Sequence, residues 1–276
     1  MDITKLGFLL FLAILPVILI LLFVYNKDKS KEPLHLLLIL FVSGFGSCVL
    51  VLLISSLMEK IIPFMDYDLP QMNFLQVLFY AFIGVALVEE LCKWIMVRFI
   101  AYNHKEFDEV YDIIVYAIFV SLGFAFVENI IYVMSSVKLI TAFLRAISAV
   151  PSHACDAVFM GYYLSIAKQY AERNDKESET KNIILSIVIP TVLHGIYDFC
   201  IMSGYTILSV VFIVFVIYLY FVTIKKLKEL AGTNQEIKKE KQFCPKCGHK
   251  IESNKFCKNC GAPIRGDFCG NCGTKQ

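Results

Sequence analysis

Charged residues are scarce in this sequence, and their scarcity excludes an ordinary soluble globular protein. They make up 18% of the 276 residues, whereas 58% are hydrophobic. The mean hydropathy is +0.66, and soluble domains usually carry about 25% charged residues. Several apolar runs approach about 20 residues, the length that crosses a bilayer as a helix. The composition therefore indicates a polytopic helical membrane protein.

The first apolar run lacks the features of a signal peptide. Residues 6–25 form an apolar core longer than that of a signal peptide, and no small-residue cleavage site follows it. We expect this segment to be retained as a membrane span. The net charge of +2 is too small to indicate an acidic partner.

Seven apolar segments predict an all-α fold, a polytopic membrane helix bundle of about seven transmembrane helices. They cover about residues 6–25, 36–57, 74–101, 113–134, 139–167, 183–202 and 205–224. Pro151 is expected to break the fifth segment. An eighth span remains open if the third segment is a broken pair. The polar residues 168–181 predict the longest loop before the tail.

Lysine and arginine are distributed unevenly between alternate loops, and this asymmetry predicts the orientation. One side carries only Lys5, Lys60 and Lys138, with Arg145 near the start of the fifth segment. The other side carries Lys27, Lys29, Lys31, Arg98, Lys105, Lys168, Arg173, Lys176, Lys181, Lys225, Lys226 and Lys228. We expect a multi-pass protein of the cell membrane, in contact with the lipid bilayer, with its N-terminus outside and its tail in the cytoplasm.

Four apolar segments nevertheless contain ionisable residues. They are Glu89, Glu90 and Lys93 in the third segment, Glu128 in the fourth, His153 and Asp156 in the fifth, and His194 and Asp198 in the sixth. A charge at the bilayer centre costs at least about 2.5 kcal/mol, and such groups usually face a bundle interior or a cavity. We therefore expect one shared polar site.

The spacing of these residues favours pairing within helices. Lys93 follows Glu89 by four positions and Glu90 by three, an arrangement that favours ion pairs. One lysine cannot neutralise two carboxylates, so one glutamate is left for another purpose. His194 and Asp198 are four positions apart and share a helical face.

Carboxylates and neutral imidazoles are the groups that water activation requires. One group takes a proton from water, and others donate hydrogen bonds to the oxyanion that forms. The same groups could hold a divalent metal that activates water itself. The sequence leaves both mechanisms open. It also leaves Asp156 undecided between the site and a hydrogen bond between helices.

The predicted depths of these groups do not agree. In the orientation above, Glu89 falls in the inner half of its span, whereas Glu128 and Asp198 fall in the outer half. At 1.5 Å per residue, the difference is about two helical turns. The third segment must be shifted, tilted or broken for one site to form.

The order of these motifs resembles the PrsW family of intramembrane proteases, part of a superfamily that includes the CAAX-prenyl endopeptidases. The matching motifs are Glu89-Glu90-x-x-Lys93, Phe124-x-x-x-Glu128-Asn129, the His153 segment and His194-Gly195-x-x-Asp198. The resemblance implies a CAAX-protease-like helix bundle. It also implies a peptidase that cleaves membrane-associated proteins, such as an anti-sigma factor.

The resemblance also implies roles for the site residues. Glu89 and Glu90 would be the catalytic carboxylate pair, and Glu89 with His153 would activate water. His194 and Asp198 would steady the oxyanion or position the substrate. Glu128 would be a further acid of the site, whereas Asp156 has no place in the family pattern.

The tail contains three C-x-x-C pairs, which predict zinc ligation in a reducing compartment. Cys244, Cys247, Cys257 and Cys260 have the spacing of a tetrathiolate zinc ribbon, whereas Cys269 and Cys272 form half of a possible second site. We expect structural zinc and a protein partner for the ribbon. Lysines without interleaved aromatic residues do not favour nucleic-acid binding.

These patterns predict three regions: a membrane-embedded protease domain (residues 1–225), a polar linker (226–242) and a cysteine-rich tail (243–276). Two alternatives to an endopeptidase remain. An ion-coupled transporter would use the buried acids as a relay and contain inverted repeats of broken helices, which are not evident here. A non-catalytic membrane scaffold would only display the ribbon, so loss of the acids would change stability alone.

Overall fold

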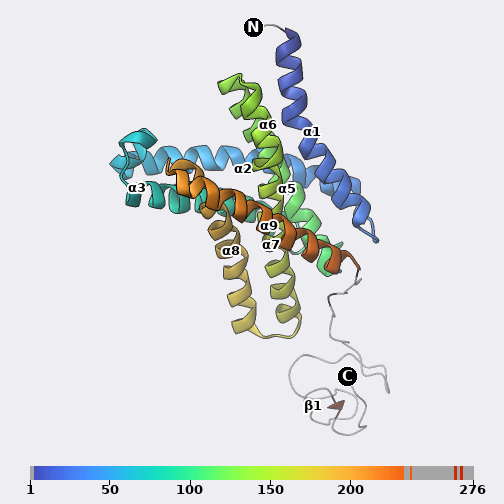
Figure 1. Cartoon of the computed structure of the whole chain (residues 1–276). Coiled ribbons are helices and arrows are strands. Elements are labelled where there is room, and N and C mark those ends of the chain that lie inside the picture. Colours follow the sequence, from blue (N-terminus) through green and yellow to red (C-terminus); the bar gives the residue numbers. More distant parts are fainter. Residues whose placement is uncertain (1–2, 233–236, 238–263, 266–267, 270–276) are drawn as a thin grey trace.

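The computed structural model describes residues 3–232, 237, 264–265 and 268–269, and its membrane region is a bundle of helices (Figure 1). The long helices are α1 (Ile3–Lys27), α2 (Leu34–Ile61), α5 (Val110–Ser136), α7 (Ala149–Glu172), α8 (Lys176–Met202) and α9 (Thr206–Gly232). A shorter helix, α6 (Leu139–Ile147), precedes α7. The predicted all-α bundle is confirmed for this region.

The third segment is one continuous helical stretch with an irregular centre. It consists of α3 (Phe74–Phe79), a π-helical segment η3 (Tyr80–Leu87) and α4 (Val88–Ile100). Two 3₁₀ turns, η1 (Pro63–Asp66) and η2 (Leu69–Gln71), lie in the loop before it. Because the stretch is continuous, the structure gives no support to an eighth span.

Six helical stretches of the described chain are long and apolar enough to cross a membrane. Helix α7 is a seventh long helix of 24 residues, but it carries more polar side chains, among them His153 and Asp156. Apolar side chains on the outer helices are exposed, such as Leu53 on α2 and Val214 on α9, each at 64%. Exposed leucine and valine on long apolar helices are expected where the neighbour is lipid.

Helix α5 is the centre of the bundle. In the most apolar 18-residue stretch of α5, 89% of the residues are buried. In the corresponding stretch of α9, 17% are buried. Glycines let α2 approach it closely, because a Cβ atom on Gly123 would lie 2.0 Å from the carbonyl oxygen of Phe41. Such close contacts between small residues are typical of helix pairs in membranes. The tight packing helps to position Glu128, which follows Gly123 by five residues on α5.

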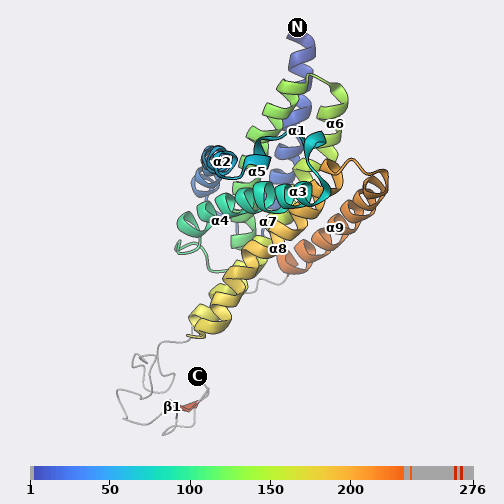
Figure 2. The same ribbon diagram turned by 90° about the vertical axis from the view of Figure 1, so that its left-hand side faces the viewer.

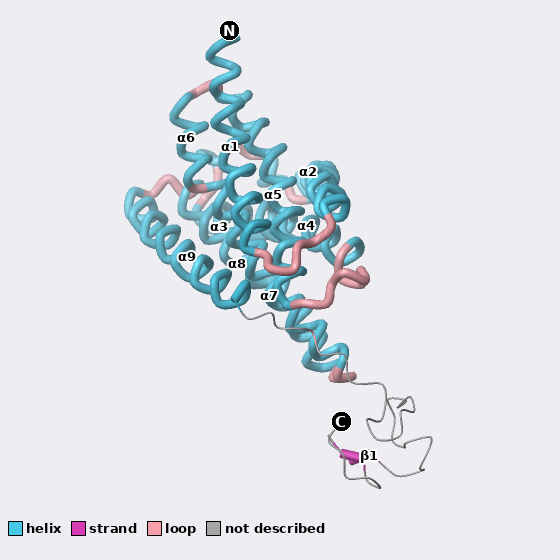
Figure 3. The backbone as a smooth tube through the Cα atoms, turned by 90° about the vertical axis from the view of Figure 1, so that its right-hand side faces the viewer, coloured by secondary structure: helices cyan, strands magenta, loops and turns pink. Residues whose placement is uncertain are grey.

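Helices α7 and α8 form an antiparallel hairpin that packs against α5 and against the π-helical segment. The α3–α4 stretch crosses this hairpin at a steep angle in both Figure 1 and Figure 2. Helix α9 lies on the outside of the hairpin. Figure 3 shows that short loops join most of these helices.

The predicted long loop at residues 168–181 is wrong. Helix α7 continues to Glu172 and α8 begins at Lys176, so the connection is only residues 173–175. The side chain of Asp175 accepts a hydrogen bond from the backbone N–H of Ser178, which caps α8. Polar residues here form the water-facing ends of two helices rather than a loop.

The predicted break in the fifth segment is confirmed. It falls at Ser148, which has φ −122° and ψ −61° and separates α6 from α7. Pro151 lies in the first turn of α7, where its missing N–H costs no intrahelical hydrogen bond. The break lets α6 and α7 take different directions next to the polar residues of α7.

The tail contains one described pair of short strands, β1 (Ile264–Arg265) and β2 (Phe268–Cys269), which are antiparallel. Of the predicted zinc ligands, Cys269 falls in β2. Cys244, Cys247, Cys257, Cys260 and Cys272 lie outside the described residues. The zinc ribbon therefore stays a prediction.

Candidate active site

The centre of the polar site is the ammonium group of Lys93 on α4. It lies 2.8 Å from Oε1 of Glu90 and 3.2 Å from Oε2 of Glu89. All three side chains are buried, with Glu90 and Lys93 at 0% exposure. The ring of Phe124 covers the ammonium, whose nitrogen lies 4.2 Å from the ring centroid. The pairing predicted from the spacing is confirmed.

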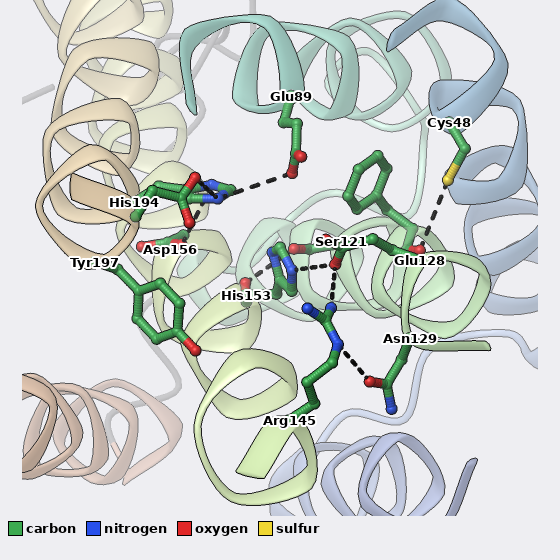
Figure 4. Close-up of polar contacts among 12 residues, drawn as sticks. Cys48, Glu89, Ser121, Glu128, Asn129, Arg145, His153, Asp156, His194 and Tyr197 are labelled. Carbon is green, nitrogen blue, oxygen red and sulfur yellow. Dashed lines mark hydrogen bonds and ion pairs between the residues drawn. The ribbon is translucent and has the colours of Figure 1, made fainter. Parts of the chain in front are cut away.

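His194 connects α8 to this centre. Its Nδ1 atom lies 2.9 Å from Oε1 of Glu90, and its Nε2 atom lies 3.9 Å from Oε2 of Glu89. Asp198, one turn later, places Oδ2 3.4 Å from the same Nε2 atom. The imidazole therefore lies between carboxylates of α4 and of its own helix. Figure 4 shows His194 and Glu89 facing each other.

His153 brings α7 into the same group. Its Nδ1 atom lies 3.2 Å from Nζ of Lys93, and its Nε2 atom lies 2.9 Å from Oε2 of Glu128. A lysine ammonium can only donate, so Nδ1 accepts from Lys93 and Nε2–H donates to Glu128. This assignment defines one neutral tautomer. The backbone of His153 is also fixed, because Ser121 Oγ donates to its carbonyl oxygen over 2.9 Å.

Arg145 on α6 closes one side of the site. Its Nη2 group donates to Oε2 of Glu128, and its Nε–H donates to Oδ1 of Asn129, both over 2.8 Å. The guanidinium also lies 4.1 Å above the ring of Tyr132. Asn129 in turn donates to the carbonyl oxygen of Ala13 on α1. Figure 4 shows this chain of contacts, which ties α6 to α5.

The site carries more negative groups than positive ones. Among the described residues it gathers five carboxyl groups, those of Glu89, Glu90, Glu128, Asp156 and Asp198, and two cationic side chains, Lys93 and Arg145. Two of the buried carboxyl oxygens, Glu90 Oε2 and Asp156 Oδ1, have no hydrogen-bond partner among the described residues, and Asp198 Oδ2 has the 3.4 Å contact with Nε2 of His194. Unpaired buried charge is costly, so the site must hold protons or a bound cation.

A small cavity of about 60 Å³ lies beside these groups. Its lining includes Glu89, His153, His194 and Asp198, together with Tyr197. Glu90 and Lys93 are fully buried behind this surface. The two adjacent glutamates thus differ in position. Glu89 lines the cavity, whereas Glu90 contacts Lys93 and His194 behind it.

The irregular third segment brings Glu89 to the same site as Glu128 and Asp198, although the sequence predicts different depths for them. The π-helical turns end at Leu87, one residue before α4 and two before Glu89. A π-helix has wider turns than an α-helix, and such turns are frequent at functional sites. They change the direction in which Glu89 and Glu90 point, and the stretch crosses α5, α7 and α8 (Figure 2). The segment is irregular at its π-helical turns but not broken, and its tilt relative to the bilayer stays a prediction.

The donor set fits a divalent metal ion. One ligand atom from each of Glu89, Glu90, His153 and His194 can be chosen so that all four lie within 4.8 Å of one another. Carboxylate oxygen and imidazole nitrogen are ligands that zinc uses. The unpartnered oxygen of Glu90 and the excess of carboxyl groups also favour a cation here.

The structure brings together all six residues that the sequence predicted for the membrane site, although their catalytic roles stay predictions. Asp156, left undecided, also belongs to the group, with Oδ2 4.0 Å from Nδ1 of His194. Arg145 was considered only for membrane orientation. A basic residue inside an apolar segment on the lysine-poor side was the signal that could have identified it.

A multi-pass helical membrane protein with buried carboxylates and imidazoles around a cavity has the architecture of an intramembrane hydrolase. The sequence model described as PrsW family intramembrane metalloprotease matches residues 32–224. The chain belongs to this family. It is therefore a protease embedded in the membrane, it acts on protein substrates and it contacts lipid. The interpretation as an enzyme is confirmed.

Individual relatives agree with this assignment. The chain is 38% identical to "Protease PrsW" of Oceanobacillus iheyensis over 216 residues, which cover 78% of this chain and 93% of the relative. It is 30% identical to the protein of that name from Clostridioides difficile, covering 83% and 94%. For that of Bacillus subtilis the identity is 35%, covering 69% and 81%. No solved structure matches the chain significantly.

Proposed function

We propose that this chain is an endopeptidase that hydrolyses peptide bonds of membrane-associated proteins with water activated at Glu89. The proposal rests on one observation: two carboxylates and two imidazoles from three helices form a buried cluster. The four residues Glu89, Glu90, His153 and His194 are each at most 7% exposed. A buried group of this composition beside a cavity suits acid–base hydrolysis.

In this proposal Glu89 takes the proton from the attacking water, because it is the glutamate of the pair that faces the cavity. His153, held in one tautomer by Lys93 and Glu128, is a fixed polar group at the same wall. The Nδ1 atom of His194 is held by Glu90, and its Nε2 atom faces Glu89 and Asp198. In the protonated ring this Nε2–H donates to the oxyanion of the tetrahedral intermediate. Preorganised donors of this kind stabilise charge that develops in the transition state.

A metal ion fits the same residues, with Glu89, Glu90, His153 and His194 as its ligands. When bound, it would supply Lewis acidity and a more acidic water. The ammonium of Lys93 makes the present contacts to Glu89, Glu90 and Nδ1 of His153, so it would move aside from these atoms when the ion binds. Asp156 completes the wall of the cavity next to His194.

We further propose the topology and the regions predicted from the sequence. The N-terminus is outside and the tail is cytoplasmic, residues 1–225 form the protease domain, and residues 226–242 link it to a tail at 243–276. In the tail, Cys244, Cys247, Cys257 and Cys260 bind one structural zinc ion, while Cys269 and Cys272 supply half of a second site. The ribbon binds a protein partner, and the substrates include regulatory membrane proteins of the anti-sigma-factor type.

The test is cleavage of tagged single-span membrane proteins in cells that produce the wild type or one of three variants. Glu89→Gln and His194→Ala should lower the amount of product about 10²- to 10⁴-fold, at protein levels matched by immunoblot. The matched control is Glu106→Gln, which changes a surface ion pair with Lys105 and should cleave normally. Undiminished cleavage by Glu89→Gln and His194→Ala would contradict the proposal.

A further inference from the structure

A second pocket lies beside the active-site cavity, and its wall is part apolar and part polar. It has a volume of about 310 Å³ and lies between the loop before α3 and the turn that joins α8 to α9. Its walls include Leu69, Met72, Phe74, Val77, Met202 and Tyr205, and no acidic or basic side chain of the described chain lines it. The rings of Phe74 and Tyr205 lie 6.0 Å apart and give the pocket a rigid aromatic wall.

Met202 lies between the two cavities, because it lines both of them. It follows His194 by eight positions and Asp198 by four, so the three residues lie along one face of α8. At 1.5 Å per residue, Met202 lies about 12 Å along the helix from His194. An extended peptide advances about 3.3 Å per residue, and it therefore covers this distance in about four residues.

The position of the pocket suits an extended substrate. It lies where helices end, beside the 3₁₀ turn η2 and the turn at Gly204, whose φ of +70° ends α8. Inside the hydrocarbon layer a backbone must satisfy its hydrogen bonds within a helix or barrel, but at the helix ends water is available. A substrate chain can be unwound there without that cost. Hydroxyl groups of Ser203 and Tyr205 also lie in the wall and can bond to peptide groups.

We propose that this pocket binds an apolar side chain of the substrate, about four residues from the peptide bond that is cut. The inference rests on the proposed endopeptidase function. Its place beside the active-site cavity, with Met202 in both walls, favours a substrate polypeptide over a lipid chain as the occupant. The pocket would then select substrates by an apolar residue at a fixed distance from the cleavage point, just as they leave the membrane.

A charge-swap experiment tests this directly. The probes are derivatives of one cleaved single-span reporter that carry Leu, Asp or Lys at the fourth position on either side of the cut bond. Wild-type protein should cleave the Leu form roughly ten times more efficiently, in kcat/KM, than the Asp form at one of these positions. Leu69→Lys, a change at a side chain that is 36% exposed, should restore cleavage of the Asp form and weaken cleavage of the Lys form.

The controls separate the pocket from the general activity. Tyr67→Lys changes a side chain of the same loop that is 47% exposed and does not line the pocket, so it should keep the wild-type preference. The reciprocal variant Leu69→Asp should favour the Lys reporter, which protects the test against a folding defect of one variant. If wild type, Leu69→Lys and Leu69→Asp showed the same preference among the three reporters, the proposal that the pocket binds a substrate side chain would be overturned. A lipid chain would then be the remaining occupant. Cleavage that persists unchanged in Glu89→Gln would instead overturn the proposed function.

Discussion

The Nδ1 atom of His194 lies 2.9 Å from Oε1 of Glu90, and this contact joins α8 to α4 across 104 positions of sequence. The same oxygen lies 2.8 Å from the ammonium group of Lys93. Glu90 therefore fixes both a cation and an imidazole while it is itself fully buried. Its neighbour Glu89 shares the cation but faces the cavity. Adjacent residues of one type thus have separate structural roles.

Removal of Lys93 should destabilise the protein strongly. Lys93→Met leaves the buried carboxylates of Glu89 and Glu90 without their cation, and breaking a buried pair in this way costs about 3–5 kcal/mol. The measurement is thermal or denaturant unfolding of the purified protein in detergent. As a control, Lys176→Met removes a surface pair with Glu179 and should change stability by less than about 1 kcal/mol. The double variant Lys93→Met/Glu90→Gln should recover part of the loss, and a double variant no more stable than Lys93→Met would count against the charge argument.

The α2–α5 crossing should not tolerate a methyl group. In Gly123→Ala the new Cβ atom would meet the backbone oxygen of Phe41 at 2.0 Å, so the helices must separate, at a cost of about 1–3 kcal/mol or more. Gly46→Ala is the matched control on α2, because its nearest contact would be the end of Met96 at 3.8 Å. That change should be neutral or stabilise by up to about 1 kcal/mol. Equal melting temperatures for the two variants would show that the helices are not in close contact.

Arg145 should be more important to stability than an exposed basic residue. Arg145→Gln removes the hydrogen bonds that the charged guanidinium donates to Glu128 and Asn129. A hydrogen bond from a charged donor contributes about 1.5–3 kcal/mol to stability. Unfolding in detergent should therefore occur at a lower temperature. Lys105→Gln, at a side chain that is 84% exposed, provides the comparison. If both variants melt alike, α6 is not held by this arginine.

Metal analysis should distinguish the membrane site from the tail. A variant with all six tail cysteines changed to serine should still bind about one divalent ion per chain, since Glu89, Glu90, His153 and His194 remain. Adding His153→Ala to that variant should abolish the remaining binding, measured as zinc content by mass spectrometry after dialysis. Zinc content that does not change on adding His153→Ala would place the ion elsewhere.

The loop between α1 and α2 should make stability depend on pH. Burial raises the pKa of Glu32 from 4.5 to about 7, and Tyr116, Asp112, Asp28 and Glu106 surround it. Because the folded state holds this proton more tightly than the unfolded state, its stabilising effect is complete below about pH 4.5 and is lost as pH rises through about 7.

The measurement is the melting temperature of wild type and Glu32→Gln between pH 5 and pH 8. The wild type should lose more stability over this range than Glu32→Gln, whose amide does not titrate. Glu59→Gln, at an exposed position of α2, should keep the wild-type dependence. Parallel curves for wild type and Glu32→Gln would rule out Glu32 as the titrating group.

The membrane site was largely predictable from sequence, because hydrophobic surroundings make buried ionisable groups conspicuous. Each of four ionisable residues lies in an apolar segment: Glu89, Glu128, His153 and His194. A shared cavity is where burying them costs the least free energy. The spacing of Lys93 also predicted its two ion pairs within one helix. The connection between His153 and Glu128 could not be predicted, because it depends on how two helices pack.

The parts that sequence could not predict are set by the backbone and by tertiary packing. No residue pattern in Tyr80–Leu87 predicts a π-helix, because this segment is as apolar as the α-helical turns beside it. The polar stretch 168–181 was misjudged because polarity was taken to indicate a loop. Asp175 followed by Ser178 and by acidic residues in the next turn is an N-cap signal that predicts a helix start.

Ile237 has a consequence for the cysteine-rich tail. Its backbone N–H donates to the carbonyl oxygen of Asp108 over 2.7 Å, and its side chain is 6% exposed within the main core. Six residues separate Ile237 from Cys244, and the seven Cα–Cα steps between the two can span at most about 25 Å. A protein bound at Cys244 would therefore lie within about that distance of Ile237, at an effective concentration in the millimolar range for contacts with the membrane domain. A weak second contact with the membrane domain would then strengthen its binding.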